Sequence, residues 1–217
     1  DILDYGIAQG VLKENLAKNK QLAKFIKKPK TKNFAAIEFE QVPLFLAKLK
    51  DYPGRTETIQ ALKLSLLTFV RPGEIRLAVW PEFDLKNSQW EIPAERVKGD
   101  HPHIVPLSRQ TLTLLSEIKR MKLSGRFLLP GIKASSPISE NTLTSAIKRL
   151  GFDATAHGMR SLFSTEMNER GFNSDHIEIQ LAHRVGNKVR GSYNHAKWLK
   201  QRREMMQIWA DLVMPDV

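Results

Sequence analysis

The hydrophobic pattern of this chain changes its period in one place, and that change limits the folds open to it. Most of the chain repeats its apolar residues with helical spacing, but between Phe83 and Leu107 apolar and polar residues alternate. Turn signals at residues 86–88 (KNS) and 99–100 (GD) divide this stretch into three short runs. We therefore expect an α+β, mainly helical fold with a small three-stranded antiparallel sheet inserted among helices.

The helical spacing appears on both sides of the strand-like stretch. Pro43 is compatible with a helix because it falls in the first turn, Asn141 and Ser139 are suitable N-caps, and Gly171 is a suitable C-cap. The segments expected to be helical are 39–50, 55–70, 72–80, 108–121, 140–150, 158–170, 174–182, 188–195 and 198–213.

The first thirty residues differ from the rest of the chain. Ile2, Leu3 and Ile7 have a roughly helical spacing that continues through residues 11–12, and a basic run around Pro29 follows. A segment of about thirty residues cannot build its own core. We therefore expect residues 1–30 to be the remnant of a mostly absent domain plus a basic linker, and residues 31–217 to be one domain with a helical tail. The chain begins without methionine, which favours a fragment or a processed form.

The chain is strongly basic, with a formal net charge of +11 and a pI near 9.9. This excess favours a polyanionic partner, although a basic protein without such a partner has the same composition. The absence of cysteine excludes a thiol nucleophile, a Cys-ligated zinc and a disulfide scaffold. No apolar run approaches the ~20 residues of a membrane helix, so we expect no membrane partner.

Several charged residues stand where burial would be costly. Arg71 follows the apolar run 64–70, and a charge there needs a partner or a bound anion. Glu74 could be that partner, so a local ion pair explains Arg71 as well as anion binding does. His157 and Arg160 are three residues apart at the start of an expected helix, which places both near the positive end of its dipole and suits a phosphate.

Three further residues complete a set suited to phosphoryl transfer. His183 follows an expected helix, Lys98 precedes the second turn, and Tyr193 lies in a polar, basic helix where its ring could also serve only for packing. Two guanidiniums can hold the non-bridging oxygens of a phosphodiester bidentately. A tyrosine hydroxyl activated by positive charge can attack the phosphorus, and a lysine can protonate the leaving alkoxide. Each residue alone is a weak signal, whereas the set is chemically coherent.

The stretches that carry these residues resemble the tyrosine recombinase family, specifically the phage and prophage integrases of genomic islands. The resemblance covers the chain from about residue 35 to its C-terminus. Many members carry glycine two residues before the first arginine, where this chain has Phe69. The matching stretches are TFVRPGEIR (68–76), IPAERVKGDHPHIVPLSRQ (92–110), SENTLTSAIKRLGF (139–152), TAHGMRSLFSTEMNERGF (155–172), QLAHRVGNKVRGSYNHA (180–196) and the tail KWLKQRREMMQIWAD (197–211).

The resemblance implies how the scissile phosphate is held. Arg71 corresponds to the first phosphate-clamping arginine, with Glu74 as its acidic companion. His157 and Arg160 match the family's His-x-x-Arg box. His183 matches the second histidine, which hydrogen-bonds the phosphate.

The resemblance also implies the covalent step. Tyr193 corresponds to the nucleophile that forms a 3′-phosphotyrosyl bond, and Lys98 to the lysine that protonates the leaving 5′ oxygen. No metal or other cofactor is implied, because the guanidiniums and the lysine neutralise the charge that Mg²⁺ neutralises in other phosphoryl transferases.

The function implied in this way is site-specific DNA recombination, for integration and excision of a prophage or genomic island. Its partners would be double-stranded DNA attachment sites, three further copies in a homo-tetramer and, by family analogy, a DNA-bending host factor and an excisionase. Its location would be the bacterial cytoplasm, with the nucleoid. Residues 1–30 would hold the last helix of the family's core-binding domain.

Two alternative functions remain open. A type IB topoisomerase uses the same chemistry without exchanging partners, and the integrase-like tail after Tyr193 argues against it. A catalytically silent DNA-binding protein could share the fold, and the six occupied catalytic positions argue against that.

Other histidines and the C-terminal stripe have simpler interpretations. His101 and His103 could form a metal pair, but with one acidic neighbour and no cysteine a DNA-facing or exposed role is favoured. His176 and His195 are interpreted as surface or capping residues. An apolar stripe in the last helix could pack on its own domain or on a neighbouring protomer; its members are Trp198, Met205, Met206 and Trp209.

Overall fold

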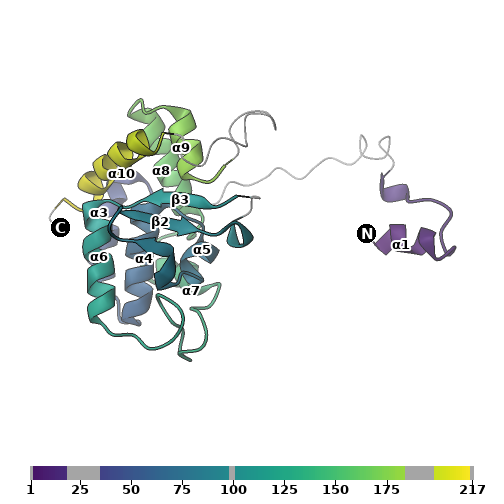
Figure 1. Cartoon of the computed structure of the whole chain (residues 1–217), viewed down its shortest axis with the longest axis horizontal. Coiled ribbons are helices and arrows are strands. Elements are labelled where there is room, and N and C mark those ends of the chain that lie inside the picture. Colours follow the sequence, from purple (N-terminus) through teal and green to yellow (C-terminus); the bar gives the residue numbers. More distant parts are fainter. Residues whose placement is uncertain (1, 19–34, 98–100, 184–197, 216–217) are drawn as a thin grey trace. The chain divides into compact units, whose positions relative to one another are not determined.

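The computed structural model describes residues 2–18, 35–97, 101–183 and 198–215 of the chain (Figure 1). Its contacts divide the chain into two units, Asp1–Asn33 and Phe34–Val217. Within the described ranges, no helix combines the length and the apolar character that crossing a membrane would require.

Unit 1 contains a short helix, α1 (Ile2–Ala8), and a 3-10 turn, η1 (Leu16–Lys18), within its described residues. The apolar spacing predicts a helix that continues through residues 11–12, and this prediction is wrong. Gly10 adopts a left-handed φ of +71°, a conformation that commonly ends helices and that glycine takes without steric cost. No residue of α1 is buried, so this helix has no core of its own.

The predicted three-stranded sheet is confirmed. Its strands, β1 (Phe83–Asp84), β2 (Gln89–Ile92) and β3 (His103–Pro106), are antiparallel in the order β1-β2-β3. Trp90 pairs with Phe83 on one side and with Val105 on the other, and all three side chains are buried. The alternation seen in the sequence therefore separates a face packed on the core from a more exposed face.

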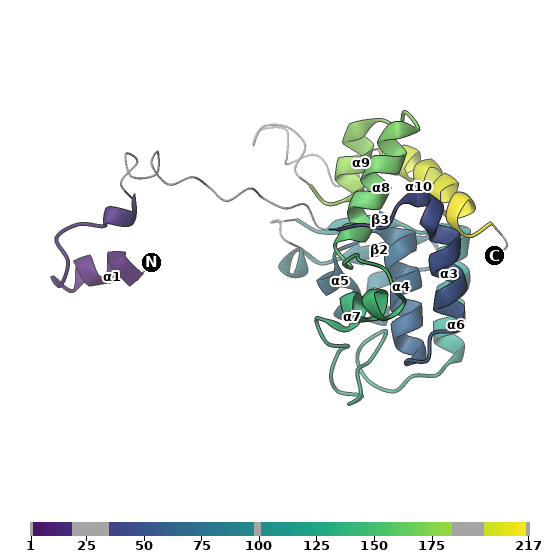
Figure 2. The same cartoon turned by 180° about the vertical axis from the view of Figure 1, so that it is seen from behind.

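Helices make up most of the described part of unit 2, which confirms the α+β, mainly helical class. The sheet lies between α8–α10 and the long helices α4 and α6 in both views (Figures 1 and 2). The helices are α3 (Val42–Lys50), α4 (Thr56–Thr68), α5 (Pro72–Arg76), α6 (Arg109–Arg120), α7 (Thr142–Arg149), α8 (Gly158–Glu169), α9 (Ser174–Gln180) and α10 (Leu199–Val213), with 3-10 turns η2 (Phe39–Gln41), η3 (Trp80–Glu82) and η4 (Ala94–Arg96).

One helix is shorter than the sequence predicts. The segment that starts at Pro72 stays helical only to Arg76, and η3 follows. Val79 has extended backbone angles (φ −132°, ψ 149°), and the carbonyl of Ala78 accepts a hydrogen bond from the N–H of Leu128 at 2.7 Å, so the chain leaves the helix before Trp80. The helix expected over residues 188–195 lies outside the described residues.

The core of unit 2 is centred on α4, which is packed against α5, α6, α7 and α10. Leu62, Leu64 and Leu66 of this helix are completely buried. Helix α10 is tied to α4 through the indole of Trp209, which donates a hydrogen bond to the carbonyl of Leu66 at 2.8 Å. Every residue from Leu64 to Thr68 is buried, so the second half of α4 is surrounded by other elements.

The apolar stripe of α10 packs on its own domain. Met205, Met206 and Trp209 are buried, and the Trp209 ring contacts both Phe69 and Phe163 at centroid distances of 4.9 and 5.5 Å. This observation decides between the two interpretations that the sequence left open for these residues.

Candidate active site

The first site residue, Arg71, is placed by the junction between α4 and α5. Helix α4 ends because Phe69 takes a left-handed φ of +55°, and Arg71 then serves as the N-cap of α5 with Pro72 at the first helical position. Glu74, only 2% exposed, accepts hydrogen bonds from the Arg71 backbone N–H at 2.6 Å and from its Nη1 at 3.0 Å. The guanidinium of Arg71 is thus held by a buried carboxylate while it stays partly open to solvent.

The second arginine, Arg160, sits in the first turn of α8 and is only 4% exposed. Its Nη1 donates to the carbonyl of Phe69, and its Nη2 donates to the carbonyl of Leu181. Burial, followed by the nearby charge of Arg71, lowers the pKa of Arg160 to about 10. The guanidinium therefore stays protonated at neutral pH, in a place where a positive charge is costly unless an anion or a carbonyl faces it.

Helix α8 is positioned by a close backbone approach at its first residue. A Cβ atom on Gly158 would lie 2.0 Å from the carbonyl oxygen of Ala35, which no side chain tolerates. The N–H of Thr155 donates to the same carbonyl at 3.0 Å. The glycine before Arg160 thus lets α8 start directly against the beginning of unit 2.

The third element of the site is the turn that follows α9. Ala182 has a φ of +51° and its N–H donates to the carbonyl of Ile179, while the N–H of His183 donates to the carbonyl of Glu178. This is the hydrogen-bond pattern of a Schellman motif, with Ala182 in the position usually held by glycine. Nη2 of Arg71 donates to the Ala182 carbonyl at 3.1 Å, so the turn also binds the first arginine.

The turn at residues 181–183 holds both arginines, since the Leu181 carbonyl accepts from Arg160 and the Ala182 carbonyl accepts from Arg71. His183 of the same turn contacts Arg160. Its Nε2 lies 3.3 Å from Nη2 of Arg160, and its Nδ1 lies 2.8 Å from a carboxylate oxygen of Glu178. His183 is 46% exposed and Glu178 is 41% exposed, so this side of the network is open to a ligand.

His157, the N-cap of α8, lies within electrostatic influence of the same residues. Partial burial and the charges of Arg160, Arg71 and His183 lower the pKa of His157 below its ordinary value of 6.5. Its ring is therefore neutral at pH 7, and it can donate or accept a hydrogen bond without adding a charge.

The structure thus brings together five of the residues that the sequence selected. Glu74 binds Arg71, the turn at residues 181–183 binds Arg71 and Arg160, and His183 of this turn contacts Arg160. Partial burial and the charges of Arg160 and Arg71 lower the pKa of His157. Lys98 and Tyr193, like His195, lie outside the described residues. Arg71 is partly exposed, Arg160 is buried, and the rings of His157 and His183 are exposed. Two guanidiniums and two imidazoles in this arrangement suit a single phosphate group.

A layer beneath the site was not predicted from the sequence. Gln180 is completely buried, donates to the carbonyl of Thr68 at 3.0 Å and accepts from the guanidinium of Arg202 at 2.8 Å. Arg202 also donates to the carbonyl of Ile104 at 2.7 Å, and burial lowers its pKa to about 10. One signal in the sequence marks this layer: Arg202 lies four residues after Trp198 and three before Met205, within an apolar stripe.

His103 corrects the exposed role expected from the sequence. It is only 6% exposed, because it lies on the same face of β3 as Val105 and points into the core. Burial, with Arg202, Arg160 and Arg71 nearby, keeps the pKa of His103 well below its ordinary value. His101 is exposed, as expected. Across the described ranges, no group of three or more His, Cys, Asp or Glu is placed to hold a metal ion.

His176 is partly buried rather than fully exposed, and its ring lies 5.1 Å from that of Trp198. Burial lowers the pKa of His176 below its ordinary value. This contact lies at the start of α10 and involves neither arginine of the site.

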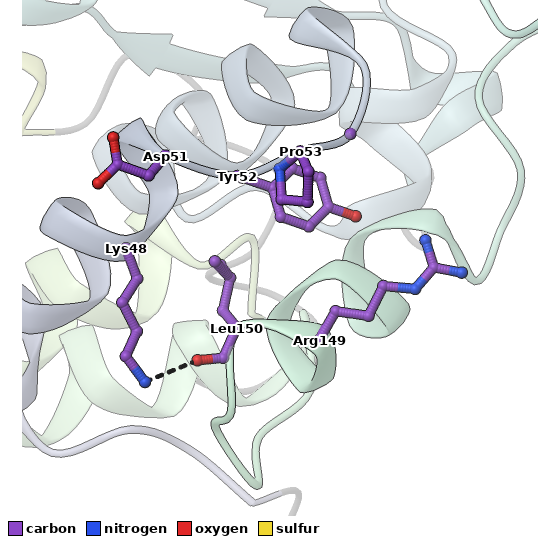
Figure 3. A pocket seen from close by; sticks show the side chains of 7 residues that line it. Lys48, Asp51, Tyr52, Pro53, Arg149 and Leu150 are labelled. Carbon is purple, nitrogen blue, oxygen red and sulfur yellow. Dashed lines mark hydrogen bonds between the residues drawn. The ribbon is translucent and has the colours of Figure 1, made fainter.

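A separate pocket of about 440 Å³ lies away from these residues, between the end of α3 and the end of α7 (Figure 3). The side chains of Lys48, Tyr52 and Arg149 line it. Nζ of Lys48 donates to the carbonyl of Leu150 at 3.0 Å, so its ammonium already ties α3 to α7. Since none of the site residues lines this pocket, it is not the candidate active site.

The chain is similar to known phage and prophage integrases. The family model described as "Phage integrase family" matches residues 35–199. The chain is 39% identical to the integrase of Enterobacteria phage P4, over 97% of this chain and 52% of that protein. It is 40% identical to the prophage integrase IntA of Escherichia coli K12, over 88% of this chain and 47% of that protein. The chain thus spans about half the length of these relatives.

Solved structures show the same fold at low sequence identity. A lambda integrase (75–356) dimer bound to a COC′ core site matches with a TM-score of 0.62 and 18% identity, over 84% of this chain and 68% of that one. The Tn1549 transposon integrase in complex with circular intermediate DNA matches with a TM-score of 0.60 and 17% identity, over 94% and 74% of the two chains.

Proposed function

The chain belongs to the phage integrase family, and from this premise we propose that it is the catalytic part of a tyrosine site-specific recombinase. It cleaves and rejoins double-stranded DNA through a 3′-phosphotyrosine intermediate, for integration and excision of a prophage or genomic island. The observation that carries this proposal is the turn at residues 181–183. Its Leu181 and Ala182 carbonyls accept hydrogen bonds from Arg160 and Arg71, and its exposed His183 ring lies 3.3 Å from Arg160.

Each residue of the site has a distinct part in the proposed reaction. Arg71 and Arg160 bind the non-bridging oxygens of the scissile phosphate, where negative charge gathers in the transition state. His183 hydrogen-bonds the same phosphate, and neutral His157 serves as a donor or acceptor beside it. Because the guanidiniums are already held by carbonyls and by Glu74, little reorganisation is needed when the substrate arrives.

The covalent step is assigned to two residues outside the described ranges, from their places in the sequence. The hydroxyl oxygen of Tyr193 attacks phosphorus, the bond to the 5′ oxygen breaks, and a 3′-phosphotyrosyl ester remains. Lys98 transfers a proton to the leaving 5′ oxygen. In the second half of the reaction a 5′ hydroxyl attacks the ester and releases the tyrosine, so no bond energy has to be supplied from outside.

The proposal extends to partners and location. The substrate is a pair of DNA attachment sites, bound by a homo-tetramer, with a DNA-bending host factor and an excisionase as helpers. The reaction takes place on the nucleoid in the bacterial cytoplasm. Charge neutralisation comes from the cationic side chains of the site, so we expect strand cleavage to continue when EDTA is present.

The first test is the formation of a covalent protein–DNA adduct. The protein is incubated with a nicked duplex that carries the core attachment sequence of its genetic element, so that the short fragment with the new 5′ hydroxyl diffuses away after cleavage. We expect a 3′-linked adduct on denaturing gels, lost in Tyr193→Phe because the nucleophile is gone. The matched control is Tyr5→Phe, an exposed tyrosine of unit 1, which should form the adduct normally.

The outcomes of this test separate the candidate functions. An adduct that survives Tyr193→Phe removes that residue from its role, and an adduct that only reseals its own strand indicates a topoisomerase. Arg71→Ala and Arg160→Ala should slow cleavage by about 10²–10³ with a much smaller loss of DNA affinity. Equal losses of cleavage and affinity would mean that the arginines only bind DNA.

A further inference from the structure

A carboxylate, an imidazole and a guanidinium form a continuous chain at the open side of the site. Glu178 lies 2.8 Å from Nδ1 of His183, whose Nε2 lies 3.3 Å from Nη2 of Arg160. We propose that Glu178 is a positioning residue, which acts through His183 to hold Arg160 in the orientation that binds the scissile phosphate. This inference rests on the proposed function and adds a residue to it.

The donors and acceptors of the chain have only one consistent order. A guanidinium can only donate, so Nε2 of His183 has to accept from Arg160 and carries no proton. The neutral ring then carries its proton on Nδ1, which donates it to the carboxylate of Glu178. Arg160 and Glu178 therefore favour the same tautomer of His183, in which Nδ1 carries the proton. Without Glu178, only the contact with Arg160 favours that tautomer.

The backbone makes Glu178 the natural partner of this ring. In the Schellman motif after α9, the N–H of His183 donates to the carbonyl of Glu178 at 2.9 Å. One residue of α9 thus receives both the backbone and the side-chain hydrogen bond of His183. The left-handed conformation of Ala182 turns the chain so that both contacts form together.

The charge of Glu178 affects the pKa of Arg160, whereas its ion pair with His183 contributes little to folding stability. Among the charges that act on the buried guanidinium, Glu178 and Glu74 raise the pKa of Arg160, against the opposing effects of burial and Arg71. Both Glu178 and His183 are more than a third exposed, and exposed ion pairs contribute little to folding stability. Loss of Glu178 should therefore leave the fold intact while it frees the His183 ring.

The test compares Glu178→Ala, Glu178→Gln and the control Asp175→Ala, which removes an exposed carboxylate one turn earlier on α9. The ¹⁵N shifts of His183, recorded at pH 8.5 where a histidine is neutral, report which ring nitrogen carries the proton. We expect a protonated Nδ1 in the wild type and in Asp175→Ala, and a shift towards a protonated Nε2 in Glu178→Ala. Glu178→Gln keeps an acceptor oxygen and should restore most of the wild-type signal.

Cleavage of the nicked duplex provides the second readout. Loss of a group that orients a functional histidine typically costs about ten- to hundredfold, and we expect Glu178→Ala to slow cleavage by that factor. Melting temperature and duplex affinity should match the wild type, and Asp175→Ala should cleave within twofold of it.

Failure of the proposed function and failure of the role proposed for Glu178 give different results. If the wild type forms no adduct, the proposed function fails, while the ¹⁵N shifts still test the role of Glu178. If the wild type cleaves DNA but Glu178→Ala keeps both the protonated Nδ1 and its cleavage rate, Glu178 does not position His183 and the inference is overturned.

Discussion

Five described non-glycine residues adopt the left-handed backbone conformation that suits glycine, and two of them, Phe69 and Ala182, lie beside the arginines of the site. Phe69 and Ala182 have φ angles of +55° and +51°, which cost about 1–2 kcal/mol each in an L-residue. In return, the Phe69 carbonyl accepts from Arg160 and the Ala182 carbonyl from Arg71. The Phe69 ring, stacked on Phe163 at 4.2 Å, offsets part of the cost through burial. This explains how phenylalanine can occupy a left-handed position that favours glycine.

A second finding at the residue scale concerns the buried His103, whose suppressed protonation makes stability depend on pH. Below about pH 6.5 the unfolded chain binds a proton at this residue and the folded chain does not, so stability falls as pH falls. We expect His103→Leu to reduce this dependence by up to about 1.4 kcal/mol per pH unit between pH 6.5 and 5. Urea unfolding at several pH values measures it. If the free energy of unfolding depends on pH equally in the wild type and in His103→Leu, then His103 takes up a proton in the folded state as it does in the unfolded chain.

At the scale of elements, the site depends on how α4, α9 and α10 are joined. The Gln180 side chain bridges the end of α4, through Thr68, to the buried guanidinium of Arg202 on α10. Gln180 also precedes the turn that carries Ala182 and His183. The last helix thus supports the site from beneath, although it contributes no residue to the open surface.

Removing the guanidinium of this layer should be costly. Arg202→Ala leaves the oxygen of Gln180 and the carbonyl of Ile104 without their donor and creates a cavity. We expect a loss of about 3–5 kcal/mol in the free energy of unfolding, measured by urea denaturation. Arg203→Ala, the adjacent and less buried arginine, should change it by less than about 0.5 kcal/mol. Similar effects of the two substitutions would contradict the role of the buried layer.

At the scale of the whole molecule, the net charge of +11 and the open cationic site act together. Such a charge attracts nucleic acids without regard to sequence, whereas in the proposed reaction Arg71, Arg160 and His183 act on one phosphate. Affinity and cleavage are therefore expected to respond differently to salt.

The different salt dependence of DNA affinity and of cleavage rate can be measured. Because binding releases counterions from DNA, we expect the affinity for a duplex to fall at least about tenfold between 50 and 200 mM salt. The rate of cleavage at saturating protein should change much less, since the site's arginines are held at short range by partly buried partners. Fluorescence anisotropy and adduct formation, recorded in the same salt series, test both parts. An affinity that is insensitive to salt would exclude a backbone-dominated contact.

Periodicity and motif spacing alone were enough to determine the fold class, the three-stranded sheet and most helices of unit 2, because these depend on local patterns of apolar residues and turns. The sequence also selected Arg71, Glu74, His157, Arg160 and His183, because of their positions beside expected helices, their joint suitability for phosphoryl transfer and the resemblance of the stretches that carry them to a known family. Only the tertiary structure decided that His103 is buried, that Glu178 contacts His183 and that Arg202 supports Gln180. Those facts depend on contacts between residues up to about a hundred positions apart and on positive φ angles at non-glycine residues, and no local pattern encodes either.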